Sequence, residues 1–506
     1  ILLILIFIAL GYIAYIPFHN YPFCMDEYNY LYQAEIFSMG KIFIEVPDRF
    51  RPFVETYVLL KDDRLFSKYP PGFPLILSLG VLLNISGIIN PLVALITLII
   101  LYSFATTFCD TKYGLLAVIL MSTTPYFLAY SASYFSQPTA LLLTAIIFFL
   151  VRKFEITSRD SYLPLLGFFS GFLFLTRPLD AFCAMMPAYL YLSYILFKKN
   201  SLNKILYPIL TFMVIFTLFL TYNYFLIGKI SIATYPIVEG EFKIVDPDAN
   251  GFFQNLRSIS KEYFMNGIKY IPGLLTQYLL IPAGLFVPLL AIFGFFKFRS
   301  PWKWVLISNY LMLILFYNFH HGYGWPLYGA RYYYSGFFSM VVFAVISSKI
   351  IIETLKNKAY VFYLLTFVLG VHIILTFTLF NEYSYRFDIR KSFREEVKRE
   401  CPDNSIIVLS RNNTFNTLSS EKACQNYDFR TTGKDKISPV ANERMCKSKV
   451  KFVNADDEKR NPFMSSSQLI TINDKYLNLE QIRSDFPNRS ICIYEYDPRT
   501  YLARML

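Results

Sequence analysis

The chain has 506 residues, of which 55% are hydrophobic and only 17% are charged, and its mean hydropathy is +0.40. Soluble domains carry about a quarter charged residues, and an apolar run of about 18 residues is long enough to cross a bilayer. Many such runs occur here, which excludes a soluble globular protein. The net charge is +12. The excess basic residues recur in short connections between apolar runs, a pattern that indicates orientation in a membrane rather than nucleic-acid binding.

The apolar runs predict a polytopic α-helical membrane protein with about 11–13 spans. The predicted spans are 1–17, 73–89, 91–108, 114–130, 137–151, 162–176, 179–197, 203–226, 272–296, 303–319, 332–348 and 359–380. We expect the first of them to be retained rather than cleaved as a signal peptide. After residue 380 the chain becomes polar, and "SIIVLS" and "SICIYEY" are typical of short strands. We therefore expect a membrane domain over 1–380, with a first external loop at 18–72, and a soluble α/β domain over 381–506.

Lysine and arginine residues predict which ends of the spans share a side. Four short connections each carry three of them, and two predicted spans separate each connection from the next. The positive-inside rule places all four in the cytoplasm, so Arg177, residues 320–331 and the C-terminal domain face outward. Four predicted spans separate 18–72 from Arg152, although an outward loop requires an odd number. One apolar piece must therefore be interfacial or re-entrant, and "PPGFPLILSLG" is the strongest candidate. The basic residues are Arg152, Lys153, Arg159, Lys198, Lys199, Lys204, Lys297, Arg299, Lys303, Lys349, Lys356 and Lys358.

The first loop begins with adjacent carboxylates, Asp26 and Glu27, in "MDEYNYLYQAEIF". A carboxylate at the membrane surface can act as a general base, because partial desolvation raises its basicity. The alternative is a solvated pair of loop charges. Tyr28, Leu31, Tyr32 and Glu35 fall on one helical face, which predicts a helix lying against lipid or protein.

The same loop ends in "SKYPPG", where Lys68 precedes Tyr69 and two prolines. The prolines favour an extended chain that would hold the ammonium group near the lipid headgroups, where it suits a lipid phosphate. The alternative is a lysine that merely extends from a helix end towards water.

Two later turns carry further candidates. In "FLTRPLDAF", Arg177 stands close to Asp180, and the two either pair with each other or line a substrate cavity. In "FHHGYGWPLYGARYYYSGFF", Arg331 begins a predicted helix among tyrosines, a setting in which a guanidinium can bind a phosphate while aromatic rings stack on a sugar. His320 and His321 have no nearby carboxylate, so they suit the polar lining of a cavity better than a metal site.

Four of the seven cysteines lie in the C-terminal domain and permit two disulfides in three pairings, with free thiols as the alternative. No zinc-site spacing, phosphate-binding glycine loop or nucleophile motif is present. The four cysteines are Cys401, Cys424, Cys446 and Cys492.

Several of these stretches together resemble a known family. "MDEYNYLYQAEIFSMGKI", "SKYPPGFPLIL", "TTPYFLAYSASYFSQP" and "GFLFLTRPLDAF" look like membrane glycosyltransferases of the GT-C fold. Within these they resemble the bacterial branch related to protein O-mannosyltransferases and to the aminoarabinose transferase of lipid A. "YGARYYYSGFF" is similar to the arginine-tyrosine helix start of that branch, so the resemblance covers roughly 1–350.

The resemblance implies an inverting transfer of a hexose or pentose from a polyprenyl-phosphate carrier to a hydroxyl or amine. It places the reaction on the extracytoplasmic face of the inner membrane, with the sugar-lipid as co-substrate and a glycan, lipid or protein as acceptor. It implies no certain cofactor and leaves a divalent cation open. Asp26 matches the family's acidic residue, with Glu27 beside it, and Lys68 and Arg331 match its donor-phosphate ligands. The cavity candidates are Tyr69, Arg177, His320 and His321.

One departure concerns the residues before Lys68, which are Phe66 and Ser67 where the lipid A branch has a carboxylate. This argues against an aminoarabinose transferase but not against the wider class. Two other functions remain as alternatives. A transporter or flippase of lipid-linked sugars would require polar residues at mid-bilayer depth. The predicted spans contain almost no such residues, with His372 as an exception, which argues against transport. A glycan ligase or polymerase would use a similar donor.

Overall fold

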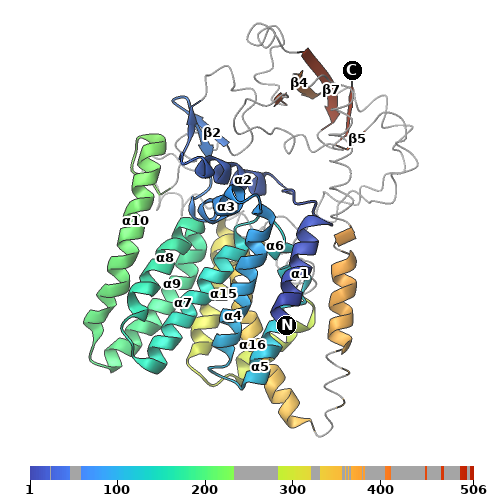
Figure 1. Cartoon of the computed structure of the whole chain (residues 1–506). Coiled ribbons are helices and arrows are strands. Elements are labelled where there is room, and N and C mark those ends of the chain that lie inside the picture. The colour runs from blue at the N-terminus through green and yellow to red at the C-terminus, as the bar shows by residue number, and fades with distance from the viewer. Residues whose placement is uncertain are drawn as a thin grey trace. The chain divides into compact units, whose positions relative to one another are not determined.

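The computed structural model describes residues 1–22, 24–45, 58–232, 283–320, 331–355, 359, 363, 366–378, 380 and 381, together with five strands of the C-terminal region. Contacts within the chain divide it into two units, and Figure 1 labels helices and strands along the chain. Ile1–Ile16 and Pro70–Leu379 form the membrane unit. Pro17–Tyr69 and Phe380–Leu506 form the second unit.

The membrane unit is built from helices. Their bounds are α1 Leu2–Tyr15, α3 Gly72–Leu82, η2 Ser86–Ile88, α4 Ile89–Ala105, α5 Thr111–Ser122, α6 Pro125–Ser131, α7 Gln137–Thr157, α8 Tyr162–Thr176, α9 Pro178–Lys198, η3 Leu202–Ile205, α10 Leu206–Ile227, α14 Phe286–Lys297, α15 Trp302–His320, η6 Arg331–Gly336 and α16 Phe337–Thr354.

Among the described residues, four helical segments are long and apolar enough to cross a membrane, and a bent pair adds a fifth. The bent pair is α5 with α6, which meet at 71°. Pro125 at the start of α6 explains the break, because proline is disfavoured inside a helix and suited to its first turn. Thr124 caps the new helix by accepting a hydrogen bond from the Phe127 amide. The four segments are Ser86–Ala105, Pro178–Lys198, Leu202–Ile227 and Arg331–Thr354.

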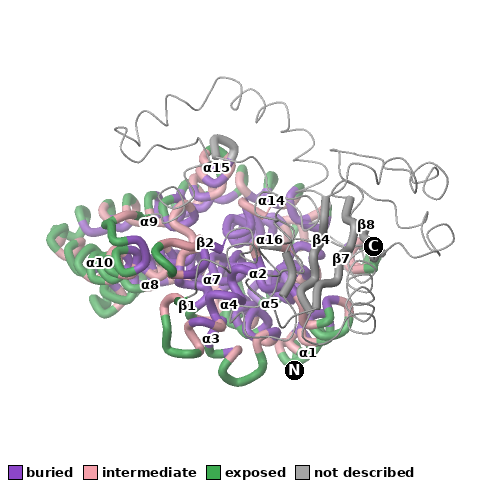
Figure 2. Tube along the Cα trace, turned by 90° about the horizontal axis from the view of Figure 1, so that it is seen from above, coloured by how far each residue is buried: buried purple, intermediate pink, exposed green. Residues whose placement is uncertain are grey.

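Burial distinguishes central from peripheral helices. In the Arg331–Thr354 segment, 78% of the apolar window is buried, whereas in Leu202–Ile227 only 11% is buried. Figure 2 shows the same contrast between α16 and the largely exposed α10. The large exposed side chains of α10 are leucine, isoleucine, valine, methionine, phenylalanine and tyrosine, which suit a helix whose outer face meets lipid.

The short helix α3 begins and ends at the same end of the membrane unit. A Cβ on Gly72, its first residue, would lie 2.5 Å from Thr176 Oγ1, at the C-terminal end of α8. After α3, Ser86 bonds the Tyr134 hydroxyl at 3.0 Å, and Asn90 donates to the carbonyls of Ser133 and Phe135. These partners directly precede α7, and Arg177, the residue after Thr176, donates to Ser136 there. With 11 residues, α3 is about 16 Å long, roughly half the hydrocarbon core.

The prediction of a span over 73–89 is therefore wrong, and the expectation that "PPGFPLILSLG" is interfacial or re-entrant is confirmed. Three predicted crossings remain between Pro70 and Arg152: α4, the bent pair α5 and α6, and α7. With 21 residues, α7 is about 31 Å long, which matches the hydrocarbon core of a bilayer. The end of α4 and the end of α7 meet where Arg152 donates to both the hydroxyl and the carbonyl of Thr107 at 3.1 Å. Pro70 thus lies at the end of the unit opposite Arg152.

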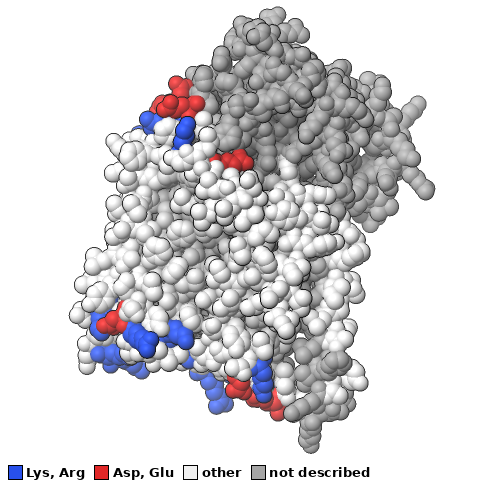
Figure 3. Space-filling model, viewed as in Figure 1, with Lys and Arg blue, Asp and Glu red and all other residues white. Residues whose placement is uncertain are grey.

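Charged residues separate the two ends of the membrane unit. At the end that holds Arg152, the described helix ends and connections contain eleven basic and four acidic residues, and Figure 3 shows Lys and Arg gathered along that edge. Lys199 donates to Ser158 at 2.7 Å and Lys204 pairs with Asp160 at 2.6 Å, which joins two of the predicted basic connections directly. The eleven are Lys112, Arg152, Lys153, Arg159, Lys198, Lys199, Lys204, Lys297, Arg299, Lys303 and Lys349.

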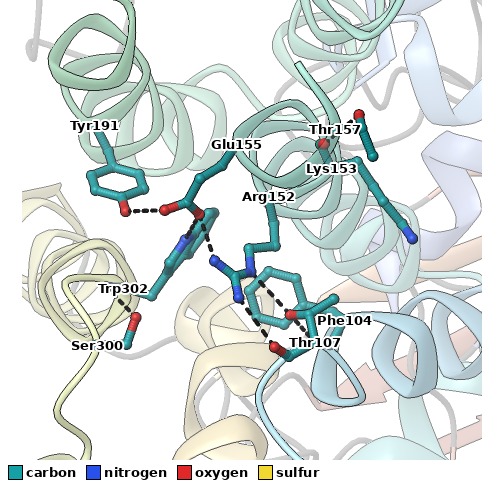
Figure 4. Close-up of polar contacts among 9 residues, drawn as sticks. All are labelled: Phe104, Thr107, Arg152, Lys153, Glu155, Thr157, Tyr191, Ser300 and Trp302. Carbon is teal, nitrogen blue, oxygen red and sulfur yellow. Dashed lines mark hydrogen bonds and ion pairs between the residues drawn. The ribbon is translucent and has the colours of Figure 1, made fainter. Parts of the chain in front are cut away.

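A polar network anchors the helices at this basic end (Figure 4). Glu155 accepts hydrogen bonds at 2.7 Å from the Trp302 indole, the Tyr191 hydroxyl and the Arg152 guanidinium. These groups come from α7, α9 and α15. Glu155 lies beyond the predicted span 137–151, and burial alone would raise its pKa. The hydrogen bonds from Trp302, Tyr191 and Arg152 outweigh burial, so the pKa of this carboxyl lies below its ordinary value.

The second unit contains one helix and two sheets among its described residues. Helix α2 spans Met25–Ser38, and strands β1 Ile44–Glu45, β2 Val58–Lys61 and β3 Arg64–Ser67 form an antiparallel sheet in the order β1-β3-β2. Asp62 and Asp63 connect β2 to β3 with φ of 49° and 59°. Positive φ at both positions is typical of the tight turn that matches strand twist in a hairpin.

The other sheet of this unit lies in the C-terminal region. Its order is β5-β8-β7-β4-β6, with β4 parallel to β6 and β7 and the remaining pairs antiparallel. The strands predicted from "SIIVLS" and "SICIYEY" are confirmed as β4 and β7. Parallel neighbours require crossover connections, as in an α/β domain, and these connections lie outside the described residues. The strands are β4 Ser405–Arg411, β5 Lys451–Phe452, β6 Leu469–Thr471, β7 Ser490–Asp497 and β8 Leu502–Met505.

Candidate active site

The acidic pair lies in the first turn of α2. Cys24 is the N-cap in an extended conformation, and Asp26 and Glu27 follow it. Carboxylates are favoured there, because the helix dipole is positive at the N-terminus. Glu27 is only 1% exposed, whereas Asp26 is half-buried. The two residues are therefore not a pair of solvated loop charges, and Asp26 is the carboxylate with access to solvent.

Tyr69 connects the two ends of the first loop. Its hydroxyl donates a hydrogen bond to Asp26 Oδ1 across 43 positions of sequence. The Lys68 ammonium lies over the Tyr69 ring, 5.1 Å from the centroid, and the ring of Tyr30 lies against it at 4.7 Å. Both Asp26 and Lys68 thus contact the same tyrosine, so the structure brings together the predicted acid and cation of the loop.

The strand that carries Lys68 is fixed to α2 by buried amides. The Ser67 amide donates to Gln33 Oε1 at 2.9 Å, and Gln33 Nε2 donates to the Ile42 carbonyl at 3.0 Å. The Ser67 hydroxyl donates to Asn29 Oδ1 at 3.4 Å and accepts from the Tyr69 amide at 3.2 Å. Asn29, Gln33 and Ser67 are almost completely buried. These contacts determine where Lys68 and Tyr69 stand relative to α2.

Sequence reasoning missed Asn29 and Gln33. Asp26, Asn29 and Gln33 occupy positions i, i+3 and i+7, which form one helical stripe. Two amides on that stripe, in a helix otherwise rich in aromatic and apolar residues, were the available signal. Tyr28, Leu31 and Tyr32 on the predicted packing face are buried, but burial extends around most of α2.

In the membrane unit, Arg177 is engaged by protein groups. Its guanidinium donates to Asp180 Oδ2 at 2.8 Å, to the Tyr317 hydroxyl at 2.9 Å and to Ser136 Oγ at 3.4 Å. The interpretation in which Arg177 pairs with Asp180 is confirmed. Arg177 caps α9 and joins α7, α9 and α15 at the end opposite the basic connections.

Arg331 begins η6, which leads directly into α16, so the predicted helix start is confirmed. Its guanidinium lies 5.0 Å from the centroid of Tyr332 and 5.9 Å from that of Phe135, and it donates to the Tyr332 hydroxyl at 3.2 Å. His320 is the last residue of α15, and its side chain lies outside the described residues, as does the whole of His321.

The predicted site residues therefore form two groups, one in each unit. Asp26, Glu27, Lys68 and Tyr69 belong to the second unit, and Arg177 and Arg331 belong to the membrane unit. In the described parts of the chain, no group of three or more His, Cys, Asp and Glu side chains is placed so that it could hold a metal ion. The cysteine pairing expected in the C-terminal domain concerns side chains outside the described residues.

Comparison with known proteins identifies the fold. Residues 68–225 match the family model of dolichyl-phosphate-mannose-protein mannosyltransferases, a match that begins at Lys68. No curated protein matches the chain by sequence. Among solved structures, ArnT from Cupriavidus metallidurans bound to undecaprenyl phosphate matches with a TM-score of 0.53 and 11% identity, covering 81% of this chain and 82% of ArnT.

The same enzyme in the apo state matches with a TM-score of 0.50 and 11% identity, over 81% of both chains. The oligosaccharyltransferase of Archaeoglobus fulgidus in its apo form gives a TM-score of 0.42 and 11% identity, covering 80% of this chain and 62% of that one. The chain is thus a polytopic helical membrane protein with the GT-C fold, related over residues 68–225 to protein mannosyltransferases.

Proposed function

We propose that the chain is a membrane glycosyltransferase that moves a sugar from a polyprenyl-phosphate carrier to a hydroxyl or amine on the extracytoplasmic face, with inversion. The observation that carries this proposal is the meeting of Asp26 and Lys68 on Tyr69. A base and a cation from opposite ends of one loop are the two groups that such a transfer requires.

The reaction needs little else from the protein, because a sugar on a lipid phosphate is already activated. The acceptor oxygen or nitrogen attacks the anomeric carbon from the face opposite the phosphate. The anomeric carbon–oxygen bond breaks, and the lipid phosphate leaves with the bonding electrons. Asp26 removes the acceptor proton, and the Lys68 ammonium stabilises the charge that develops on the departing phosphate.

Tyr69 has two roles in this scheme. Its hydroxyl donates to Asp26 Oδ1, and we assign the acceptor proton to Oδ2, the oxygen that the Cys24 thiol faces at 3.8 Å. Its ring supports the Lys68 ammonium through a cation–aromatic contact. Glu27, buried next to Asp26, acts on the reaction through its neighbour rather than on the acceptor itself.

The donor class is supported by the similar structure of ArnT, which holds undecaprenyl phosphate. The extracytoplasmic side is supported by charge. Eleven basic residues mark one end of the membrane unit as cytoplasmic by the positive-inside rule. Three crossings separate that end from Pro70, and Lys68 precedes Pro70 by two residues.

The proposal is tested by Asp26→Asn and Lys68→Met in purified protein and in membranes. We expect Asp26→Asn to lower sugar transfer by about a hundredfold or more, the range of a lost general base, while undecaprenyl phosphate still binds. Lys68→Met should weaken undecaprenyl phosphate binding by about tenfold, because a charge-assisted contact is lost.

Matched controls are available in the same unit. Asp63→Asn makes the same chemical change in an exposed hairpin turn, where asparagine tolerates the positive φ. Lys41→Met removes an exposed lysine. Transfer unchanged by Asp26→Asn would refute the assigned base. Mass spectrometry of glycans from a deletion strain separates transfer of a single sugar from ligation or polymerisation.

A further inference from the structure

Asp180 is a buried carboxylate to which the proposed chemistry assigns no role. It is 2% exposed, and three donors from different elements surround it. Ser335 of η6 donates to Oδ1 at 2.6 Å. Arg177, the N-cap of α9, donates to Oδ2 at 2.8 Å, and the Tyr317 hydroxyl of α15 donates to the same oxygen. One side chain therefore joins η6, α9 and α15.

Two routes lead from Asp180 to Arg331. The first runs through Ser335, which lies four residues after Arg331 in the same short helix. The second runs through Tyr317, whose ring stacks on Tyr332 at 4.6 Å with an interplanar angle of 4°. The Tyr332 hydroxyl in turn accepts from the Arg331 guanidinium. Asp180 thus holds both the backbone that carries Arg331 and the ring on which its guanidinium rests.

The cluster brings two guanidinium groups to one aromatic ring. Arg177 and Arg331 both lie over the Tyr332 ring, at 5.9 Å and 5.0 Å. Asp180 forms an ion pair with Arg177. Among the described residues at this end of the membrane unit the basic side chains are Arg177, Lys229 and Arg331, and Asp180 is the acidic one. Asp180 is thus paired with Arg177, and Arg331 is the second guanidinium of the cluster, a group that forms charge-assisted contacts with phosphates.

We infer that Asp180 is a positioning residue, which fixes η6 so that Arg331 can bind the phosphate of the lipid carrier. The inference rests on the proposed function, because it takes its ligand from there. It predicts a change in phosphate affinity, on loss of the Asp180 carboxylate, that is opposite in direction to the change expected from charge alone. Loss of a carboxylate near an anion site should strengthen anion binding on charge alone, whereas loss of a positioning residue weakens it.

The sharpest test removes one hydroxyl rather than the charge, because a neutral variant of Asp180 leaves the Arg177 guanidinium buried without its ion pair. Ser335→Ala deletes the contact between Asp180 and η6. Ser339→Ala is the matched control: it lies one turn further on, is equally buried, and its hydroxyl has no hydrogen-bond partner among the described residues. Arg331→Ala gives the full effect of the guanidinium.

The measurement is the Kd for undecaprenyl phosphate with the full-length protein in nanodiscs, alongside Tm. We expect Ser335→Ala to raise Kd about five- to tenfold, the size of one ordinary hydrogen bond. Ser339→Ala should leave Kd unchanged, and Asp180→Asn should raise it despite removing a negative charge. A purely structural role would lower Tm for Ser335→Ala without changing Kd.

The outcomes separate this inference from the proposed function. If Arg331→Ala weakens binding and Ser335→Ala does not, Asp180 is not a positioning residue and the proposed donor site stands. If Asp180→Asn tightens binding, simple electrostatics holds and the inference is overturned. If Arg331→Ala itself leaves Kd unchanged, Arg331 is not a phosphate ligand and the inference falls, whereas the roles proposed for Asp26 and Lys68 stand or fall with their own variants.

Discussion

Gln33 provides the clearest test of how the candidate active site is held together. The substitution Gln33→Met keeps the length of the side chain and removes both of its polar groups. In the wild type these groups pair with the Ser67 amide at 2.9 Å and with the Ile42 carbonyl at 3.0 Å. After the substitution, both backbone groups remain in place without this partner.

The magnitude follows from burial. Gln33 and Ser67 are almost completely buried, so water cannot replace the lost partner without local opening. An orphaned buried donor or acceptor costs about 1–3 kcal/mol. For the Ser67 amide alone, that cost corresponds to exchange with solvent that is faster by about 5- to 150-fold, since 1.4 kcal/mol is a factor of ten.

Hydrogen–deuterium exchange of the peptide covering β3 measures this directly. Gln137→Met is the control, because it makes the same chemical change at a buried glutamine of the membrane unit whose side-chain oxygen has no hydrogen-bond partner among the described residues. We expect faster exchange at Ser67 in Gln33→Met alone, with weaker binding of undecaprenyl phosphate as Lys68 loses its fixed position. Unchanged exchange at Ser67 would refute the reasoning, because it would show that Gln33 does not hold the strand.

Two further predictions concern the membrane unit. The pKa of Glu155 lies below its ordinary value of 4.5, so its network contributes stability above that pH and loses it as pH falls below; Tm of the wild type should drop over this range, and that of Glu155→Gln should drop less. Gly72→Ala would place a Cβ 2.5 Å from Thr176 Oγ1 and 2.7 Å from the Leu175 carbonyl carbon, which should destabilise the protein by about 1–3 kcal/mol. Gly370→Ala meets no atom within 4 Å and serves as the control; equal Tm for both variants would contradict the close approach of α3 to α8.

Local patterns predicted much of the architecture. Long apolar runs predicted helices such as α4, α9, α10 and α16, and alternating or β-branched runs predicted β4 and β7. Short connections rich in lysine and arginine predicted which helix ends lie together, and the ion pair between Lys204 and Asp160 bears this out. These features depend on composition and period over neighbouring residues, which the sequence displays directly.

The sequence predicted individual residues of the candidate site but not the contacts that join them. Asp26 and Lys68 stood out because each charge borders an apolar segment. That Tyr69 joins them was not predictable, because the contact depends on how a strand packs on a helix. The same limit applies to Gln33, whose partner Ser67 lies 34 positions away.

The sequence by itself determined that this chain is a polytopic membrane protein with a polar C-terminal region, because hydrophobicity and charge act on each segment separately. It also required one apolar segment not to cross the membrane. The sequence marked "PPGFPLILSLG" as the strongest candidate, and only the tertiary structure, in which both ends of α3 pack at one end of the membrane unit, decided the point. Only the tertiary structure, likewise, placed Asp180 between η6, α9 and α15. Contacts between distant segments depend on their joint packing, and no local pattern encodes that.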